Sequence, residues 1–200
     1  MSTLKVDTIL KRTGTGTITL GQSGDTISIP SGATLNSAGT NTLSGVASEY
    51  FSTTAFYATM DGSQNISHNT ETKVAFSQET YDLGSNYDTS SYTYTAPSAG
   101  YYRFDVSVHV ASESDGQMKT TRAFIRFTPS GGSASRVVPS FKDNESSRQR
   151  REPHTFGIVR LLAANEAVEI FGYANVTSGT PLIYYDGTYA QNYFSGYRIH

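Results

Sequence analysis

Five residues close to the C-terminus have side chains suited to binding carbohydrate. Tyr184, Tyr185 and Tyr189 carry rings that stack on the apolar faces of sugars, and Asp186 and Asn192 carry groups that hydrogen-bond to hydroxyls. This pattern predicts a ligand-binding loop for a surface glycan. The alternative interpretation is that these tyrosines pack in the core or against another copy of the chain.

A compact positive cluster lies earlier in the chain, where Arg148, Arg150 and Arg151 follow a polar segment, residues 142–147, that is predicted to be a loop. The planar guanidinium group of arginine forms paired hydrogen bonds with carboxylates and phosphates. The cluster therefore predicts contact with an acidic protein of a larger particle or with an anionic polysaccharide. The alternative is a solvated loop.

Motifs for catalysis and metal binding are missing from the sequence. It contains no G-x-S-x-G segment, phosphate-binding loop or H-E-x-x-H segment. Glycoside cleavage needs two carboxylates about 5–10 Å apart, and the sequence alone identifies no such pair. His68, His109, His154 and His200 lack metal-ligand spacing, and we expect them at the surface. The prediction is a non-enzyme with no catalytic residue, metal or cofactor.

The composition favours β-structure and excludes several classes of partner. The 200 residues include 14 Tyr, 10 Phe and 18 Gly, which combines strand formers with turn formers. Only 16% of residues are charged and the net charge is -2, so we expect no nucleic-acid partner. No segment approaches the roughly 18 apolar residues of a membrane span, and the N-terminus does not resemble a signal peptide. We expect assembly in the cytoplasm of the producing cell without membrane insertion.

The chain divides into two regions of different amino-acid composition. Residues 1–48 are rich in Gly, Ser and Thr, and their few apolar residues include the alternating pairs Ile18/Leu20 and Ile27/Ile29. These predict short strands with one apolar face, which cannot offset the entropy of folding without neighbours. We expect an N-terminal β-rich arm that attaches to other proteins or to further copies of the chain; the alternative is a disordered tail.

Residues 49–200 form the predicted core-bearing domain. Apolar residues alternate with polar ones from Tyr102 to Val110, which is typical of a strand with one buried face. Many short segments of this kind, with no amphipathic helix, predict an all-β sandwich or jelly roll. The other predicted strands span residues 54–60, 72–76, 92–95, 122–127, 155–162, 167–173 and 193–199.

The order of short motifs in this domain resembles the globular head of complement component 1q, a jelly roll related to the tumour-necrosis-factor domain. The most specific segment is Tyr94–Phe104, with Pro97 and Gly100 at fixed positions, and the segment Phe194–Ile199 resembles the closing strand of the family. The remaining matches are the segments 55–58, 74–76 and 81–87.

This resemblance implies a jelly-roll head that forms a homotrimer. Heads of this family sometimes hold calcium, and Asp82 and Asp88 lie near the relevant turn, but no dense carboxylate cluster accompanies them. Residues 165–168 occupy the position of a turn that in the family usually has a glycine-aspartate pair. The sequence therefore departs from the family pattern at this turn.

The segment Ser2–Ile9 followed by the Gly/Thr-rich arm resembles the N-terminus of structural proteins of tailed bacteriophages. That setting explains a head without an export signal, because phage particles assemble in the bacterial cytoplasm and leave by lysis. We expect a virion-surface protein, either a trimeric fibre or knob for host attachment or a capsid decoration protein that stabilises the shell. A polysaccharide-degrading tip is a further alternative.

Overall fold

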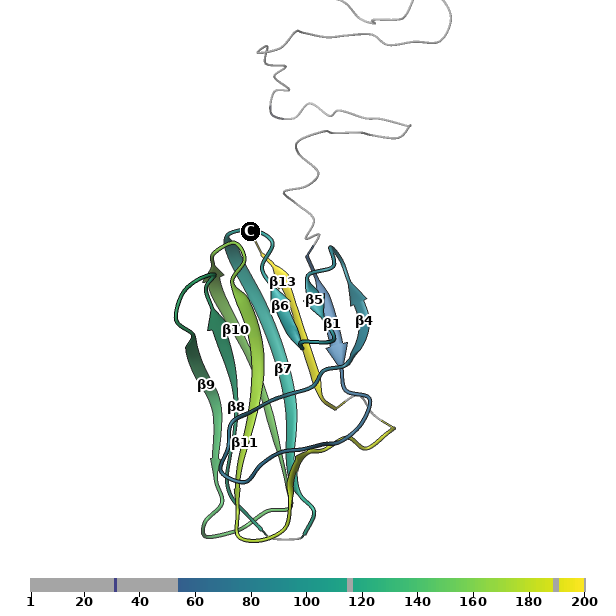
Figure 1. Ribbon diagram of the computed structural model, residues 1–200, viewed down its shortest axis with the longest axis vertical. Helices are drawn as coiled ribbons and strands as arrows, with labels where there is room; N and C mark the ends of the chain where they lie inside the picture. Colours follow the sequence, from purple (N-terminus) through teal and green to yellow (C-terminus); the bar gives the residue numbers. More distant parts are fainter. Residues whose placement is uncertain (1–30, 32–53, 115–116, 189–190, 200) are drawn as a thin grey trace, which may run out of the picture. The chain divides into compact units, whose positions relative to one another are not determined.

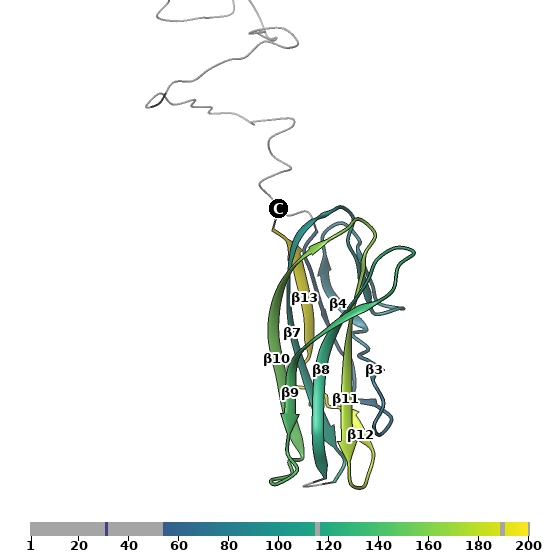
Figure 2. The same cartoon turned by 90° about the vertical axis from the view of Figure 1, so that its left-hand side faces the viewer.

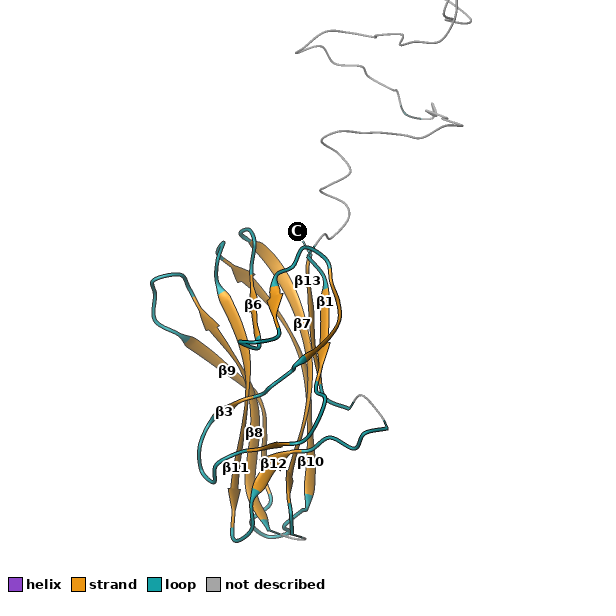
Figure 3. Ribbon diagram, turned by 45° about the vertical axis from the view of Figure 1, so that its right-hand side comes forward, coloured by secondary structure: helices purple, strands orange, loops and turns teal. Residues whose placement is uncertain are grey.

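The computed structural model describes Ser31 and residues 54–114, 117–188 and 191–199. Apart from Ser31, the predicted arm of residues 1–48 lies outside these residues, so both its structure and its boundary stay predictions. The described residues form strands and loops and contain no helix (Figure 3).

Thirteen strands within the described residues form two sheets. The first sheet has the spatial order β2 (Gln64–Asn65), β12 (Pro181–Ile183), β7 (Gly100–Ser112), β13 (Tyr193–Arg198), β1 (Phe56–Thr59) and β4 (Gln78–Asp82), with β10 (Arg151–Leu162) paired to β7. The second has the order β5 (Tyr87–Asp88), β6 (Thr93–Thr95), β11 (Ala167–Val176), β8 (Met118–Thr128) and β9 (Ser135–Asp143), with β3 (Thr72–Lys73) paired to β11. In Figure 2, β10, β7 and β13 lie on one side and β8 and β11 on the other. The predicted all-β jelly-roll sandwich is confirmed.

Strand β7 is the centre of the first sheet. It pairs with β10 from Gly100 opposite Leu162 to Ala111 opposite Arg151, and it also pairs with β13 and then with β12. The predicted strand is confirmed and extends beyond its predicted ends. Its fully buried side chains are those of Tyr102, Phe104, Val106, Val108 and Val110. Because successive side chains point to opposite faces, the odd-numbered residues of β7 face away from the core.

Aromatic rings fill the space between the sheets close to the closing strand. The ring of Phe56 lies 4.6 Å from that of Tyr94 in a stacked arrangement and 4.8 Å from that of Phe194 in an edge-on arrangement. Gly196 is needed here, because an added Cβ would lie 2.5 Å from the Phe104 ring and 2.9 Å from the Phe56 ring. The glycine of this segment therefore serves close packing of the core.

Strand β9 corrects one prediction, since the sequence assigns residues 142–147 to a loop. Lys142 and Asp143 instead belong to β9, which pairs with β8 at the edge of the second sheet. An edge strand tolerates Pro139, which lacks a backbone donor, because one side of the strand has no neighbour in the sheet. The strand is also largely exposed, so it lacks the alternation of buried and exposed residues that identifies β7.

A second correction concerns His154, which the sequence places at the surface. Its side chain is fully buried, and its Nδ1 and Nε2 atoms lie 2.8 Å from Ser140 Oγ and 2.9 Å from Thr121 Oγ1. His154 comes from β10 of the first sheet and its two partners from β9 and β8 of the second. The imidazole thus links the two sheets through hydrogen bonds.

The head has two distinct ends along its strands. Strand β1 begins and β13 ends at one of them (Figure 1). Directly after β13, the Ile199 N–H donates to the Tyr101 carbonyl. Strand β7 runs from this end to the opposite one and finishes there at Ser112. Side chains at these two ends have different characters, as described below.

Candidate functional site

A pocket of about 240 Å³ lies at the end of the head where β7 finishes. Its lining combines charged, aromatic and aliphatic side chains. The lining residues are Ala111, Ser112, Glu113, Arg150, Arg151, Leu182 and Tyr184. We call it the Arg–Tyr pocket.

Strand pairing on both sides of β7 builds the walls of the pocket. Ala111 is paired with Arg151 of β10 on one side and with Leu182 of β12 on the other. The three side chains therefore project from the same face of the sheet. The Ser112 N–H donates to the Arg150 carbonyl over 2.9 Å, which holds the segment before β10 against the end of β7.

The guanidinium of Arg151 lies over the ring of Tyr184, 3.7 Å from the ring centre. This cation–π contact joins two residues that the sequence assigns to separate sites. Tyr184 is held in place through its backbone, because its N–H donates to the His109 carbonyl over 2.8 Å. The pocket thus unites part of the predicted glycan loop with part of the predicted arginine cluster.

The structure places Asn192, one of the predicted ligand-binding residues, behind the wall of the pocket. Its side chain is buried, its Oδ1 accepts a hydrogen bond from the His109 N–H, and its Nδ2 donates to the Tyr184 carbonyl. Both ends of the amide are therefore used within the protein. Asn192 ties the Tyr184 segment to β7 and so fixes one wall of the pocket.

The other predicted site residues lie outside the lining of the pocket. Tyr185 packs against the core cluster, as the alternative interpretation of the tyrosines expects. Asp186 accepts hydrogen bonds from the Thr188 N–H and from the side chain of Gln191. Arg148 is exposed and does not line the pocket, and Tyr189 lies outside the described residues.

The sequence does not single out Glu113, Ala111 or Leu182, which complete the pocket. Nothing in their local sequence marks them as a site, because they meet the arginines only through the pairing of β7 with β10 and β12. The sequence alone does not reveal this order of strands in the sheet. The pairing places an aliphatic wall beside two arginines and one glutamate.

The charges around the pocket are mixed. Among the described residues, the lining contains Arg150, Arg151 and the carboxylate of Glu113. Burial lowers the pKa of the neighbouring His109 below its ordinary value, the positive charge of Arg151 lowers it further, and Asp186 acts in the opposite direction. His109 is therefore neutral at pH 7, and the positive charge of the site comes from the arginines.

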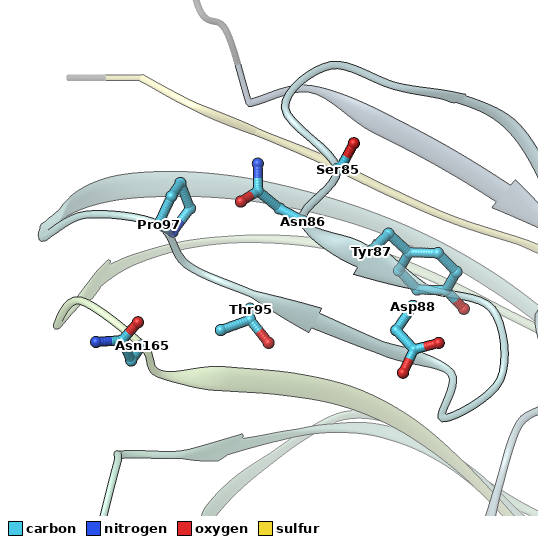
Figure 4. Close-up of a pocket in the computed structure, with 7 residues that line it drawn as sticks. All are labelled: Ser85, Asn86, Tyr87, Asp88, Thr95, Pro97 and Asn165. Atoms are coloured by element: carbon cyan, nitrogen blue, oxygen red, sulfur yellow. The ribbon is translucent and has the colours of Figure 1, made fainter.

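A second depression, of about 470 Å³, is lined by polar residues near β5 and β6 (Figure 4). Its single lining carboxylate, Asp88, accepts hydrogen bonds from both Ser90 and Ser91, which lower its pKa well below the ordinary value. The backbone of Asn165 is bonded to Ala96 in the turn that the sequence predicts before β11. These polar groups stabilise turns, so this depression is the weaker candidate for a ligand site.

Neither a metal cluster nor a membrane span is found within residues 54–114, 117–188 and 191–199. No three or more His, Cys, Asp or Glu residues of these segments gather closely enough to hold an ion. Of the two acids considered for calcium, Asp82 accepts a hydrogen bond from the Tyr87 N–H, and Asp88 is engaged as described above. The same segments contain no helix that is long and apolar enough to cross a membrane.

Large apolar side chains are exposed at the end of the head where β13 finishes. Five of them, each between 46% and 59% exposed, lie on or directly after the neighbouring strands β10, β7 and β13. We call this surface the apolar patch, and its residues are Tyr101, Val159, Leu161, Tyr197 and Ile199. In the sheet Leu161 is paired with Tyr101, and Ile199 is hydrogen-bonded to Tyr101, so these three residues form a continuous row. In the next row Arg103 lies between Val159 and Tyr197.

The apolar patch and the Arg–Tyr pocket lie on the same outer face of the first sheet. Tyr101 belongs to the patch and Ala111 to the pocket, and both are odd-numbered residues of β7. Ten residues of extended strand span roughly 33 Å. The two surfaces therefore lie at opposite ends of one face.

Comparison with known proteins agrees with this architecture. The family model of the C1q domain matches residues 55–199, and the chain belongs to this family of generally non-catalytic domains. Among solved structures, the Eiger TNF from S. frugiperda is 10% identical with a TM-score of 0.51, over 74% of this chain and 91% of that one. The globular domain of the zebrafish complement 1qA protein is 15% identical with a TM-score of 0.49, over 74% and 97%. No curated protein matches the chain.

Proposed function

We propose that the protein is a trimeric, non-enzymatic attachment protein that presents the Arg–Tyr pocket to a glycan at the surface of a bacterial host. The observation that carries this proposal is the placement of an apolar patch and a ligand-sized pocket at opposite ends of one sheet face. One end is suited to assembly. The other end is suited to recognition.

The apolar patch supports assembly into a trimer. C1q and TNF domains typically form homotrimers. A contiguous exposed apolar surface marks an interaction site, because water is displaced favourably when a partner covers it. We propose that two further copies of this chain cover the patch.

A charge pair beside the patch is compatible with burial in this interface. The Arg103 guanidinium donates to the Asp105 carboxylate over 2.6 Å and lies across Gly157, so that neither charge would enter the interface unpaired.

The predicted arm fits the same assembly. Residues 1–48 contain too few apolar side chains to form a core alone, and three copies that are held together at the base of their heads would supply neighbours. Strand β1, which comes directly after the first described residues of the head, begins at the same end as the patch.

The proposed setting is the surface of a tailed bacteriophage particle. The resemblance of residues 2–9 and of the Gly/Thr-rich arm to phage structural proteins supports it. A fibre or knob that attaches to the host is the role that makes use of the pocket. A capsid decoration protein that stabilises the shell is the second candidate.

Immunogold labelling of intact particles tests this proposal, combined with adsorption of the purified protein to host cells. We expect label at the tail tip and saturable adsorption to cells. Label over the whole shell without adsorption would replace attachment with decoration. The absence of label on any particle would refute the virion setting.

A further inference from the structure

The cation–π pair in the Arg–Tyr pocket determines which kind of group can be recognised there. Arg151 covers one face of the Tyr184 ring, so this face is not available for stacking on a sugar. The guanidinium keeps its N–H donors, which lie in one plane and form a fork. The pocket therefore offers a fixed fork of donors in place of a bare aromatic platform.

A planar anion is the natural partner of such a fork. Carboxylates accept two parallel hydrogen bonds from one guanidinium, and these charge-assisted bonds are stronger than neutral ones. Within the described part of the chain, the guanidinium of Arg151 pairs with no carboxylate, and Tyr184 is its ring contact. The preorganised cation thus faces the pocket without an acidic neighbour of its own.

The Glu113 carboxylate limits the negative charge that the pocket accepts. It lines the pocket together with Arg151. Glu113 would repel a group with two negative charges more strongly than a sugar with one carboxylate. The Glu113 carboxylate is then suited to accept hydrogen bonds from sugar hydroxyls.

The size and the aliphatic wall complete the fit. Pockets for drug-sized ligands hold roughly 300–1,000 Å³, and the Arg–Tyr pocket, at about 240 Å³, suits a single sugar unit. Leu182 provides an apolar surface for the C–H groups of a pyranose ring.

We propose that the Arg–Tyr pocket binds a sugar that carries one carboxylate, such as a uronic acid unit of an acidic surface polysaccharide. The inference rests on the proposed attachment function and adds the class of ligand. In a trimer, three pockets at one end of the particle protein would contact repeated acidic units of one polymer, and multivalency would strengthen binding. Arg151 provides the donor fork and Glu113 the hydroxyl acceptor.

Binding of methyl glucuronide to the full-length protein at pH 7 tests the inference, measured by saturation-transfer NMR and by calorimetry. Methyl glucoside is the neutral counterpart, and glucose 6-sulfate carries one charge on a tetrahedral group. We expect binding of the glucuronide, weaker binding of the sulfate and no measurable binding of the glucoside. Equal binding of glucoside and glucuronide, or preference for the sulfate, would overturn the inference.

Variants identify the residue that makes the contact. Arg151→Gln should weaken glucuronide binding about tenfold or more, because it removes a hydrogen-bonded charge. Arg151→Lys keeps the charge but lacks the fork of donors. Its affinity for glucuronide should lie between that of the unmodified protein and that of Arg151→Gln. Arg148→Gln, an exposed arginine outside the pocket, is the matched control and should bind as the unmodified protein does. Equal losses in Arg148→Gln and Arg151→Gln would contradict the assignment, provided that both variants keep the β-sheet circular dichroism spectrum.

Adsorption to host cells separates this inference from the proposed function. If the protein adsorbs to cells and glucuronide does not compete, the ligand class is wrong and attachment stands. If the protein binds glucuronide and does not adsorb to any host cell, the attachment function fails and the ligand class stands.

Discussion

Gly196 lies where the rings of Phe56 and Phe104 approach the backbone of the closing strand. A side chain at this position must displace at least one of these buried rings, because an added Cβ would lie less than 3 Å from both. Overpacking of this kind costs typically about 1–3 kcal/mol. We expect Gly196→Ala to lower the free energy of unfolding by this amount, measured by urea denaturation. The exposed Gly62, where an added Cβ meets nothing, gives the control Gly62→Ala.

His154 makes the stability of the head depend on pH. Burial, assisted by the positive charge of Lys142, lowers the pKa of His154 to about 4. The unfolded chain, with an ordinary histidine pKa near 6.5, then binds more protons than the folded chain at intermediate pH. Stability is therefore full above pH 6.5 and falls as the pH drops towards 4, by up to about 3 kcal/mol for this residue.

Urea denaturation at pH 7 and at pH 4.5 measures this effect. We expect the unmodified protein to lose stability between the two values and His154→Gln to lose less, since glutamine does not titrate. His109, whose pKa is also lowered, remains in both proteins, so the difference between them isolates His154. Equal losses in the two proteins would show that His154 does not control the transition.

At the scale of strands, the apolar patch predicts how the chains associate. Leu161 on β10 is 59% exposed in the single chain and lies beside Tyr101 in the sheet. A charge placed there would be buried without a partner on association, which is strongly unfavourable. We expect Leu161→Glu to shift the protein from trimer to monomer in analytical ultracentrifugation.

Val138→Glu provides a matched control for this experiment. Val138 is an exposed apolar residue of β9, at the edge of the other sheet, and lies outside the patch. We expect this variant to remain trimeric. Dissociation of both variants to the same extent would indicate a general loss of stability, and dissociation of Val138→Glu alone would move the interface to the second sheet.

The sequence predicted the strands that have a strong alternation and missed those that do not. Apolar and polar residues alternate over 102–110 because one face of β7 is buried and the other is not, so the pattern alone predicts the strand. Strand β9 carries no such pattern, since it lies at a sheet edge and contains Pro139. The short strands β2, β5 and β12 are defined by their partners more than by their own residues.

The candidate site, too, could be predicted from the sequence only in part. The sequence identified Tyr184 and Arg151 from their chemistry and placed them in different sites, because 32 other residues separate them in the chain. They meet because β10 and β12 both pair with β7 at Ala111. Such pairing depends on contacts between distant segments, which the local pattern of either segment does not contain. The buried role of Asn192 was missed for the same reason.

At the scale of the whole molecule, one face of the first sheet has two proposed roles. The apolar patch at one end is proposed to bring three copies together, and the Arg–Tyr pocket at the other end is proposed to recognise an acidic sugar. Both depend on β7, which runs between them and keeps its outward side chains on one face. We propose that assembly comes first, because multivalent recognition requires more than one chain.

The mass of the purified full-length protein in solution tests whether three copies associate through the apolar patch. Light scattering at micromolar concentration should give three times the chain mass of 21.7 kDa. The mass should stay the same when the protein is diluted within the micromolar range. A protein that is fully folded by circular dichroism and that has the mass of one chain would contradict the account, because the patch would then remain exposed to water.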